Sequence, residues 1–265
     1  MADVIADLLA DPGAALIALD FDGTLAPIVE RPQDAQPAGG AIEALRRLAG
    51  VVGQVAVITG RPAEEVVRIA ALDGVAGIRV LGHYGLQTWH DGRLDTPPAD
   101  PRVELARQRL PELLALAPGG VYVEDKDHSV AVHTRPAASP QQALDDLVPA
   151  LRALAAEVGL EAVSGRYTME LRPAGVDKGA ALRDLVAEVG AKTVIYVGDD
   201  VGDLPAFRTI ASLRETGEIS GLAVVVVGGG TAEEVPADLR AAADFELPGP
   251  EAVVAWLAGL TAVLT

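Results

Sequence analysis

Short runs of aliphatic residues recur along the chain, and each run ends at a glycine or an acidic residue. Each is roughly five residues long and almost entirely apolar, which is typical of strands buried on both faces of a parallel sheet. Apolar residues spaced three or four positions apart predict helices in three segments between these runs. Alternating strands and helices favour a doubly wound α/β fold with ligands at the carboxyl ends of the strands. The predicted strands are 15–20, 55–60, 78–82, 194–200 and 222–230, and the predicted helices are 40–49, 64–71 and 178–190.

The middle of the chain has a different pattern, which begins after the proline-rich segment 95–102. Helical spacing and alternating segments follow one another in the order helix, strand, strand, helix, strand, strand. This order predicts an α+β domain at 101–174, inserted between the core segments 1–100 and 175–265. Its predicted elements are a helix ending near Ala117, two strands in 121–135, a helix at 139–158 and two strands in 161–173 that turn at Gly165.

Composition limits the class of protein. Of the 265 residues, 50% are hydrophobic, which is enough for a large core, and none is a cysteine, which excludes disulfides and thiolate metal sites. A reducing cytoplasm is therefore the expected compartment. A formal net charge of −17 argues against a nucleic-acid partner. The N-terminus has no basic residue ahead of its apolar residues, and no apolar run reaches the roughly 20 residues of a membrane span, so we expect neither a secretory signal nor a membrane partner. The apolar tail 252–265 predicts a helix packed on the core.

Two acids, Asp20 and Asp22, follow directly after the first predicted strand. At the carboxyl edge of a sheet they would face the ligand crevice, and Gly23 allows a close backbone approach. Two such carboxylates can divide their work, one as nucleophile or metal ligand and the other as general acid and base. The alternative is a simple turn at Asp22 and Gly23.

Three more acids, Asp199, Asp200 and Asp203, lie at the end of another predicted strand. Carboxylates this close repel one another unless a cation offsets them, and oxygen ligands without Cys or His favour Mg²⁺. A solvated acidic loop is the alternative interpretation.

Phosphate-binding groups are predicted at two helix starts. Thr59, Gly60 and Arg61 end the second strand with a hydroxyl, a glycine and a cation at the start of a helix, and Lys178 opens a later helix. Taken one by one, a Thr-Gly-Arg sequence occurs often by chance, and Lys178 could be an ordinary surface lysine. Their occurrence together with the acids, in one chain, makes chance an improbable explanation.

As a set, these motifs resemble the phosphatases of the haloacid dehalogenase (HAD) superfamily over 15–207: "DFDGTL", Thr59, Lys178 and "GDDVGD" occur in the family's order. The resemblance implies a HAD-like core in which Asp20 is the nucleophile that forms an aspartyl-phosphate, and Asp22 is the acid and base. Thr59 and Lys178 would hold the phosphoryl oxygens. Mg²⁺ would bind the Asp20 carboxylate, the Asp22 carbonyl and Asp199, with Asp203 and Asp200 in support.

The inserted domain resembles the cap of trehalose-6-phosphate phosphatases in the segments 121–135 and 165–179, and the segment 80–87 is similar to that family's stretch after the third strand. A cap closes over the site and selects the leaving group. The resemblance implies four residues that hydrogen-bond sugar hydroxyls. A solvated sheet face with cross-strand ion pairs is the alternative for them. The four residues are Glu124, Lys126, Arg135 and Glu170.

The chain departs from the family pattern at three positions. The family often has G-D-D-x-T-D-E, whereas here Gly202 replaces the Thr and Leu204 the Glu, and Gln87 replaces a common Glu. The first two departures put the support of the metal ligands in question, and the third questions any role of position 87. The three histidines nearest these motifs have no metal-like spacing and are expected to be structural or peripheral; they are His83, His128 and His133.

The leading hypothesis is a Mg²⁺-dependent phosphatase that releases trehalose and phosphate from trehalose 6-phosphate, its small-molecule sugar-phosphate partner. Another phosphorylated disaccharide or a glycosyl-glycerate is the alternative substrate. A non-catalytic sensor would be expected to lose Asp20, Asp22 or Lys178, all of which are present. A phosphotransferase is also conceivable, but a large cap favours hydrolysis. We take a monomer as the working expectation, since the sequence has no signal for the oligomeric state.

Overall fold

The protein is described by a computed structural model that covers residues 2–29, 31–165, 167–228 and 235–265. The chain divides into two compact units, one made of Met1–Thr96 with Asp177–Thr265 and the other of Pro97–Val176. The second unit begins four residues before the insert predicted from the sequence and ends two residues after it.

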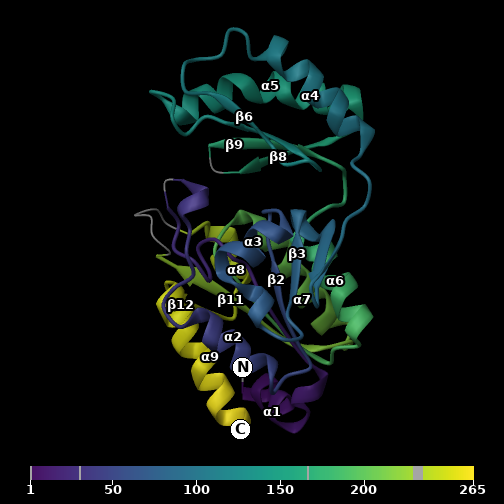
Figure 1. Ribbon diagram of the computed structural model, residues 1–265, viewed down its shortest axis with the longest axis vertical. Coiled ribbons are helices and arrows are strands. Elements are labelled where there is room, and N and C mark those ends of the chain that lie inside the picture. Colours follow the sequence, from purple (N-terminus) through teal and green to yellow (C-terminus); the bar gives the residue numbers. More distant parts are fainter. Residues whose placement is uncertain (1, 30, 166, 229–234) are drawn as a thin grey trace. The chain divides into compact units, whose positions relative to one another are not determined.

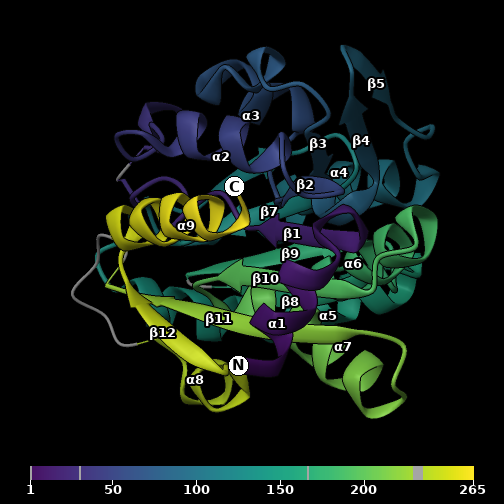
Figure 2. The same ribbon diagram turned by 90° about the horizontal axis from the view of Figure 1, so that it is seen from below.

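The first unit, whose helices and strands Figure 1 shows in part by label, is built on a sheet of eight strands within the described residues. Their order is β12-β11-β10-β1-β2-β3-β4-β5, which can be followed in Figure 2. Strands β12 to β3 are parallel, and β4 and β5 extend the sheet antiparallel at one edge. The predicted α/β fold with a large parallel sheet is confirmed. The strands are β1 (Ala15–Leu19), β2 (Gln54–Ile58), β3 (Arg79–Gly82), β4 (Gln87–His90), β5 (Arg93–Asp95), β10 (Thr193–Gly198), β11 (Ser220–Val227) and β12 (Phe245–Pro248).

All five predicted strands are present, and the hairpin β4–β5 and the edge strand β12 were not predicted. The run predicted at 222–230 forms β11 up to Val227, while residues 229 and 230 lie outside the described residues. In the centre of the sheet, Leu19 at the end of β1 pairs with Val197 of β10 and Val57 of β2. The residues that follow these three strands therefore meet at one edge.

Helices cover both faces of this sheet, which explains why its strands are apolar throughout. Ile17 and Leu19 pack in the cluster formed with α1, α2, α3 and α9, whereas Leu16 and Ala18 pack in the cluster formed with α6, α7 and α8. Figure 2 shows α2 and α9 on one side of the sheet and α6 and α7 on the other. The helices are α1 (Ala2–Ala10), α2 (Ala41–Ala49), α3 (Ala63–Ala70), α6 (Lys178–Val189), α7 (Leu204–Glu215), α8 (Ala237–Ala242) and α9 (Pro250–Leu264).

The C-terminal helix α9 packs on the core, as predicted. It buries Val253, Leu257 and Leu260, which lie on one face at helical spacing. Among the described residues, no helix combines the length and the apolar character that crossing a membrane requires.

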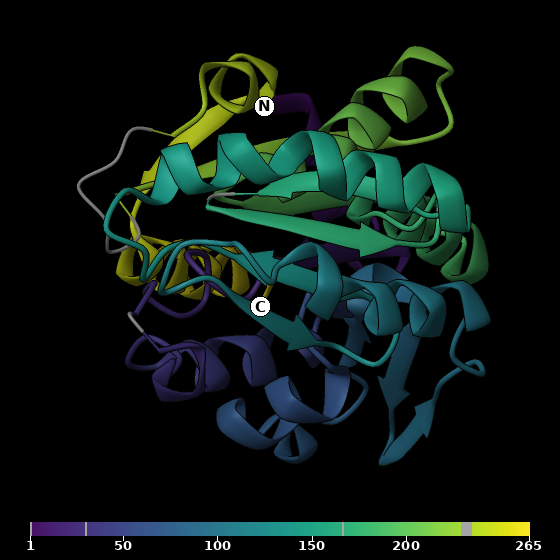
Figure 3. The ribbon, with the colours of Figure 1, turned by 90° about the horizontal axis from the view of Figure 1, so that it is seen from above.

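The second unit has the predicted order of elements, with a four-stranded antiparallel sheet β6-β7-β9-β8 among its described residues. Leucines of α5 pack against Val130, Val132, Met169 and Leu171 on one face of this sheet. Figure 3 shows the helices of this unit in front of its strands. The elements are α4 (Pro101–Leu113), β6 (Tyr122–Asp125), β7 (Val130–His133), α5 (Pro140–Val158), β8 (Glu161–Gly165) and β9 (Thr168–Arg172).

Candidate active site

Four of the predicted site residues lie at the ends of elements of the first unit. Asp20 comes directly after β1, Thr59 after β2 and Asp199 after β10, and these three strands are adjacent and parallel. Lys178 is the first residue of α6, whose start is capped by Asp177 through a 2.8 Å hydrogen bond from the backbone N–H of Ala180. The topology therefore brings carboxylates, a hydroxyl and an ammonium to one edge of the sheet.

Lys178 is buried between two carboxylates. Its Nζ lies 2.7 Å from Oδ1 of Asp20 and 2.8 Å from Oδ1 of Asp203, and its side chain is 5% exposed. Burial alone would lower the pKa of Lys178, but the negative charges of Asp20 and Asp203 outweigh burial and raise this pKa well above its ordinary value. The lysine is therefore a fixed positive charge beside the predicted nucleophile.

Asp203 uses both of its oxygens to hold the loop together. Oδ1 accepts hydrogen bonds from Lys178 Nζ and from the hydroxyl of Tyr196, at 2.8 and 2.7 Å. Oδ2 accepts from the backbone N–H groups of Asp199 and Asp200, at 2.9 and 3.1 Å. A Cβ atom at Gly198 would lie 2.3 Å from the Asp203 carboxyl carbon, so only glycine fits there. With four donors bound, Asp203 is suited to orienting Lys178 and Asp199.

Tyr196 is a member of this cluster that sequence reasoning missed. It lies in the predicted strand and is fully buried, so its apolar setting gave no sign of a polar contact. Burial raises the pKa of Tyr196 well above its ordinary value, and the neighbouring Asp203 carboxylate adds to the rise. The hydroxyl therefore remains protonated and donates to Asp203. The only available signal was a tyrosine three residues before Asp199, on the strand that ends in the acids.

The carboxylate of Asp199 has an unsatisfied oxygen. Its Oδ1 is buried and has no hydrogen-bond partner among the described residues. Ligand oxygens of Asp20, Asp199 and Asp203 all lie within 4.8 Å of one another. A Cβ atom at Gly23, whose φ is +79°, would lie 2.0 Å from Asp199 Oδ2, so the glycine is required for this close approach.

The electrostatics of the cluster match the needs of a hard cation. Burial raises the pKa values of Asp20 and Asp199 well above the ordinary range, and mutual repulsion among the carboxylates adds to the rise, against the lowering effect of Lys178. Clustered carboxylate oxygens, one of them without a partner, are the donors that a divalent cation such as Mg²⁺ prefers. The residues present therefore fit a metal ion of this class.

The turn after β2 holds the predicted phosphate-binding residues. Thr59 is buried, and its Oγ1 accepts a 3.1 Å hydrogen bond from the backbone N–H of Arg61. A Cβ atom at Gly60 would lie 2.8 Å from the ring of Tyr84, which explains the glycine. Arg61 binds Asp22 rather than standing unpartnered: Nε lies 2.6 Å from Oδ2 and Nη2 lies 2.8 Å from Oδ1.

In the second unit, three of the four residues assigned to the sugar lie together on the sheet. Lys126 Nζ lies 3.7 Å from Glu124 Oε2 and 3.8 Å from Glu170 Oε2. His133, which was expected to be structural or peripheral, lies 2.7 Å from Glu124 Oε2 through its Nε2. Arg135 is exposed, two residues beyond the end of β7, and takes no part in these contacts.

Gln87, the third departure from the family pattern, has a structural contact. Its Oε1 accepts a 3.0 Å hydrogen bond from the backbone N–H of Ala63, the first residue of α3. The amide therefore satisfies a helix-start donor that a side-chain cap would otherwise bind. This contact gives position 87 a supporting role at the helix that follows Arg61.

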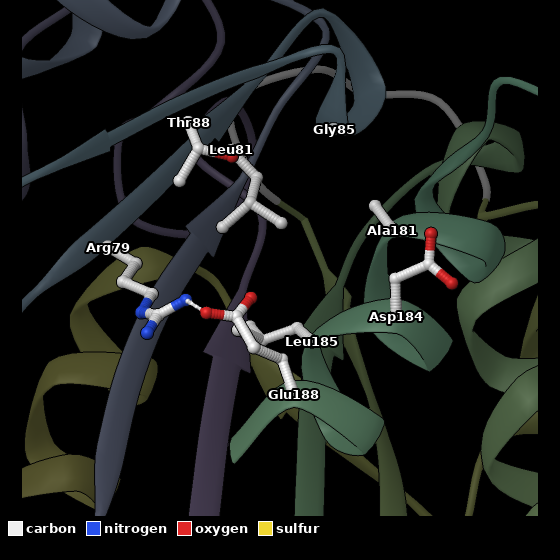
Figure 4. Close-up of a pocket in the computed structure, with 8 residues that line it drawn as sticks. All are labelled: Arg79, Leu81, Gly85, Thr88, Ala181, Asp184, Leu185 and Glu188. Atoms are coloured by element: carbon white, nitrogen blue, oxygen red, sulfur yellow. Dashed lines mark hydrogen bonds and ion pairs between the residues drawn. The ribbon is translucent and has the colours of Figure 1, made fainter. Parts of the chain in front are cut away.

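A separate small cavity of about 90 Å³ lies between β3, β4 and α6. Figure 4 shows Arg79 and Glu188 on its border, joined by an ion pair of 2.6 Å. Its lining shares no residue with the acidic cluster, so we interpret it as a gap in the packing of α6 on the sheet. The lining residues are Arg79, Leu81, Gly85, Thr88, Ala181, Asp184, Leu185 and Glu188.

Residues 18–239 match the trehalose-phosphatase family. The chain belongs to this family. The match to the trehalose-phosphatase family spans both units and contains every predicted site residue. The chain is 36% identical to a trehalose-phosphate phosphatase of Mycobacterium avium over 218 residues, which are 78% of this chain and 53% of the relative. It is also 37% identical over 256 residues to an uncharacterized glycosyl hydrolase of Mycobacterium tuberculosis, covering 91% of this chain and 18% of that protein.

The chain therefore spans about half the length of the trehalose-phosphate phosphatase of M. avium, and much less of the glycosyl hydrolase. Among solved structures, the C-terminal domain of a Candida albicans trehalose-6-phosphate phosphatase superposes with a TM-score of 0.80 at 18% identity, covering 98% of this chain and 96% of that chain. A haloacid dehalogenase-like hydrolase from Bacteroides thetaiotaomicron superposes with a TM-score of 0.65 at 15% identity, covering 93% and 99%. These likenesses confirm the HAD-like fold.

Proposed function

We propose that the protein hydrolyses trehalose 6-phosphate to trehalose and phosphate through an aspartyl-phosphate on Asp20. The observation that supports this most directly is the buried ion pair of 2.7 Å between Asp20 and Lys178, next to an unpartnered oxygen of Asp199. A nucleophilic carboxylate must meet an anionic phosphoryl group, and such an approach needs nearby positive charge. The trehalose-phosphate phosphatases among the relatives support the choice of substrate.

In this mechanism an Asp20 oxygen attacks phosphorus as the bond from phosphorus to the sugar oxygen breaks. Asp22 gives its proton to the departing sugar oxygen, so that trehalose leaves neutral. Asp22 then takes a proton from water, which attacks the phosphorus of the aspartyl-phosphate and releases phosphate. Thr59 Oγ1 and Lys178 Nζ stabilise the phosphoryl oxygens throughout. Asp203 keeps Lys178 in place through its 2.8 Å hydrogen bond.

Asp20, Asp199 and the backbone carbonyl of Asp22 would hold Mg²⁺, with Asp203 and Asp200 supporting them. When bound, the ion offsets the charge of the carboxylates and of the phosphoryl group. The orphaned Oδ1 of Asp199 is the feature of this chain that fits such an ion.

We assign selection of the sugar to the second unit, because its segments resemble the cap of trehalose-6-phosphate phosphatases. Glu124, Lys126 and Glu170 form a cluster of acceptors and donors suited to hydroxyl groups. Ser129 Oγ donates a 2.5 Å hydrogen bond to Glu170, which fixes this carboxylate. Another phosphorylated disaccharide or a glycosyl-glycerate is the alternative substrate, because the same catalytic residues would serve it. A cytoplasmic location and a monomeric state stay predictions.

Phosphate release from trehalose 6-phosphate, compared with sucrose 6-phosphate, glucose 6-phosphate and mannosyl-3-phosphoglycerate, tests this function. Each substrate is measured with Mg²⁺ and with EDTA. We expect strong, EDTA-sensitive preference for trehalose 6-phosphate, and no turnover by Asp20→Asn with an unchanged circular dichroism spectrum. Preference for another member of the panel would replace the substrate and keep the mechanism. Wild-type turnover by the Asp20 variant would exclude this residue as the nucleophile.

A further inference from the structure

The side chain of Asp22 is occupied by Arg61 in a way that conflicts with the acid and base role proposed for it. The guanidinium group binds both carboxylate oxygens, at 2.6 and 2.8 Å, and such two-point pairs are among the strongest in proteins. An aspartate held on both oxygens has none placed to serve a leaving group. Because the proposed reaction needs one of them, Arg61 has to release Asp22 before the sugar oxygen departs.

The surroundings of Arg61 indicate which group replaces Asp22 as the partner of its guanidinium group. Its backbone N–H lies 3.1 Å from Thr59 Oγ1, the hydroxyl assigned to the phosphoryl group, and its backbone carbonyl accepts a 3.0 Å hydrogen bond from the N–H of His83. The backbone of Arg61 is therefore fixed beside the phosphate position, so a change of partner involves its side chain alone. A phosphate offers the same pair of oxygens as a carboxylate and more negative charge.

Glu65 binds the one terminal nitrogen of Arg61 that Asp22 does not use. Arg61 Nη1 lies 2.7 Å from Oε1 of Glu65, which is in the first turn of α3. The guanidinium carbon also lies 5.8 Å from the centre of the Phe21 ring, within reach of a cation–π interaction. Arg61 is only 12% exposed at its side chain, so its surroundings restrict it. Glu65 can keep its contact while Asp22 is exchanged for another anion.

We propose that Arg61 exchanges partners, from Asp22 in the substrate-free protein to the phosphoryl group when substrate binds, and that Glu65 is the positioning residue that keeps it within reach of both. The inference rests on the proposed function and adds to it a coupling between phosphate binding and the release of Asp22. While Arg61 binds Asp22, both carboxylate oxygens are engaged, and binding of the phosphoryl group to Arg61 releases them. Among the described residues, the hydrogen bond and ion pair of Glu65 are to Arg61, and not to Asp22 or to the other predicted phosphate-binding residues.

A double-mutant cycle with inorganic phosphate as the probe tests the exchange. Dissociation constants are measured by calorimetry with Mg²⁺ for the wild type, Asp22→Asn, Arg61→Ala and the double variant. Removing the Asp22 charge frees Arg61, so we expect Asp22→Asn to tighten phosphate binding about 10-fold. Asp22→Asn also removes the repulsion between the Asp22 carboxylate and phosphate, and this effect remains when Arg61 is absent. In the Arg61→Ala background the same change should therefore tighten phosphate binding by no more than about 3-fold. Equal tightening in both backgrounds would overturn the exchange.

The role of Glu65 is measured in the Asp22→Asn background, where Arg61 has no ion pair with Asp22 to break. We expect Glu65→Ala to weaken phosphate binding about 5-fold and Glu65→Gln, which keeps an acceptor for Nη1, to restore most of the loss. Glu64→Ala, at an exposed position on the same turn, is the matched control and should have no effect. An unchanged affinity for phosphate in Glu65→Ala would show that Glu65 does not position Arg61.

These measurements separate the inference from the proposed function, because phosphate binding does not depend on the sugar. Failure to hydrolyse trehalose 6-phosphate, with the cycle as expected, would remove the substrate and keep the exchange. Absence of phosphate binding in every variant, with melting temperatures that show folded protein, would overturn the exchange. Normal hydrolysis with no coupling between the two positions would overturn the exchange alone.

Discussion

Replacing Asp199 tests stability and metal binding separately, because its buried Oδ1 has no hydrogen-bond partner among the described residues. Its carboxylate lies in a cluster whose ligand oxygens are within 4.8 Å of one another. At an effective dielectric constant of about 20, two unit charges at this distance repel by about 3.5 kcal/mol. Lys178 offsets part of this repulsion through its contact with Asp20. Replacing Asp199 by Asn should therefore stabilise the metal-free protein by about 2 kcal/mol.

Differential scanning calorimetry in EDTA measures this effect. For a chain of this size each kcal/mol shifts the melting temperature by about 2–4 °C, so Asp199→Asn should melt roughly 4–8 °C above the wild type. Asp184→Asn removes the same charge from an exposed position on α6 and should melt within about 1 °C of the wild type.

Adding Mg²⁺ should reverse the order of the two proteins. A ligand at 100 times its dissociation constant stabilises the folded state by about 2.7 kcal/mol, and the wild type should gain most of this. The Asn variant lacks the charge that draws the ion and should gain much less. If Asp199→Asn melts at or below the wild-type temperature in EDTA, and gains as much from Mg²⁺ as the wild type, then Asp199 neither suffers repulsion nor binds the ion.

Three further changes test other parts of the cluster and the cap. Tyr196→Phe removes one of the two donors to Asp203 Oδ1. We therefore expect kcat to fall about 3- to 10-fold and the free energy of unfolding to fall by about 1 kcal/mol. If both values are unchanged, Tyr196 does not position Asp203. Glu170→Ala should raise KM for the sugar phosphate at least 10-fold and leave KM for p-nitrophenyl phosphate within about 2-fold, whereas equal effects would remove Glu170 from sugar selection. In EDTA, burial and then neighbouring charges raise the folded-state pKa values of Asp20 and Asp199, so the folded protein binds more protons than the unfolded chain. The contribution of these two carboxyl groups to the stability of the metal-free protein should therefore fall as pH rises from the unfolded value of 3.8 through the raised folded values. Urea titrations should show Asp199→Asn gaining stability relative to the wild type over this window, and the absence of such a gain would contradict the assignment.

The sheet and its edge were predictable because their signals are local and repeated. Strands buried on both faces need apolar residues at every position, and helices on each side need apolar residues at helical spacing, so both patterns remain visible in the sequence. The short hairpin β4–β5 has no long apolar run, and it was missed although the two residues between its strands, Asp91 and Gly92, both have positive φ and form a strong turn signal. Its first residue, Gln87, contacts the start of α3, a pairing between segments that no local pattern encodes.

Residue types at the site were predictable, whereas their partners were not. The sequence placed Arg61 near the phosphate, but its choice between a phosphate and Asp22 depends on side-chain geometry across 39 residues of chain. Tyr196 was not predicted because it lies in an apolar run of the sequence. Such a run does not show whether a buried tyrosine hydroxyl has a polar partner. His133 gave no metal spacing and was set aside, although it lies within hydrogen-bonding distance of Glu124. Polar contacts of this kind are decided by tertiary structure, after the elements have packed.

The departures at positions 202 and 204 are explained by how the acidic loop is supported. Asp200 Oδ1 accepts a 2.8 Å hydrogen bond from the backbone N–H of Gly202, while Asp203 Oδ2 accepts from the backbone N–H of Asp200, so the two acids cap the turn reciprocally. A Cβ atom at position 202 would lie 3.0 Å from Asp200 Oδ1, and a threonine there would crowd this carboxylate. Leu204 begins α7 and packs against the apolar cluster of α6 and α7. Because neither position contributes a ligand oxygen to the carboxylate cluster, the departures leave the acids in place.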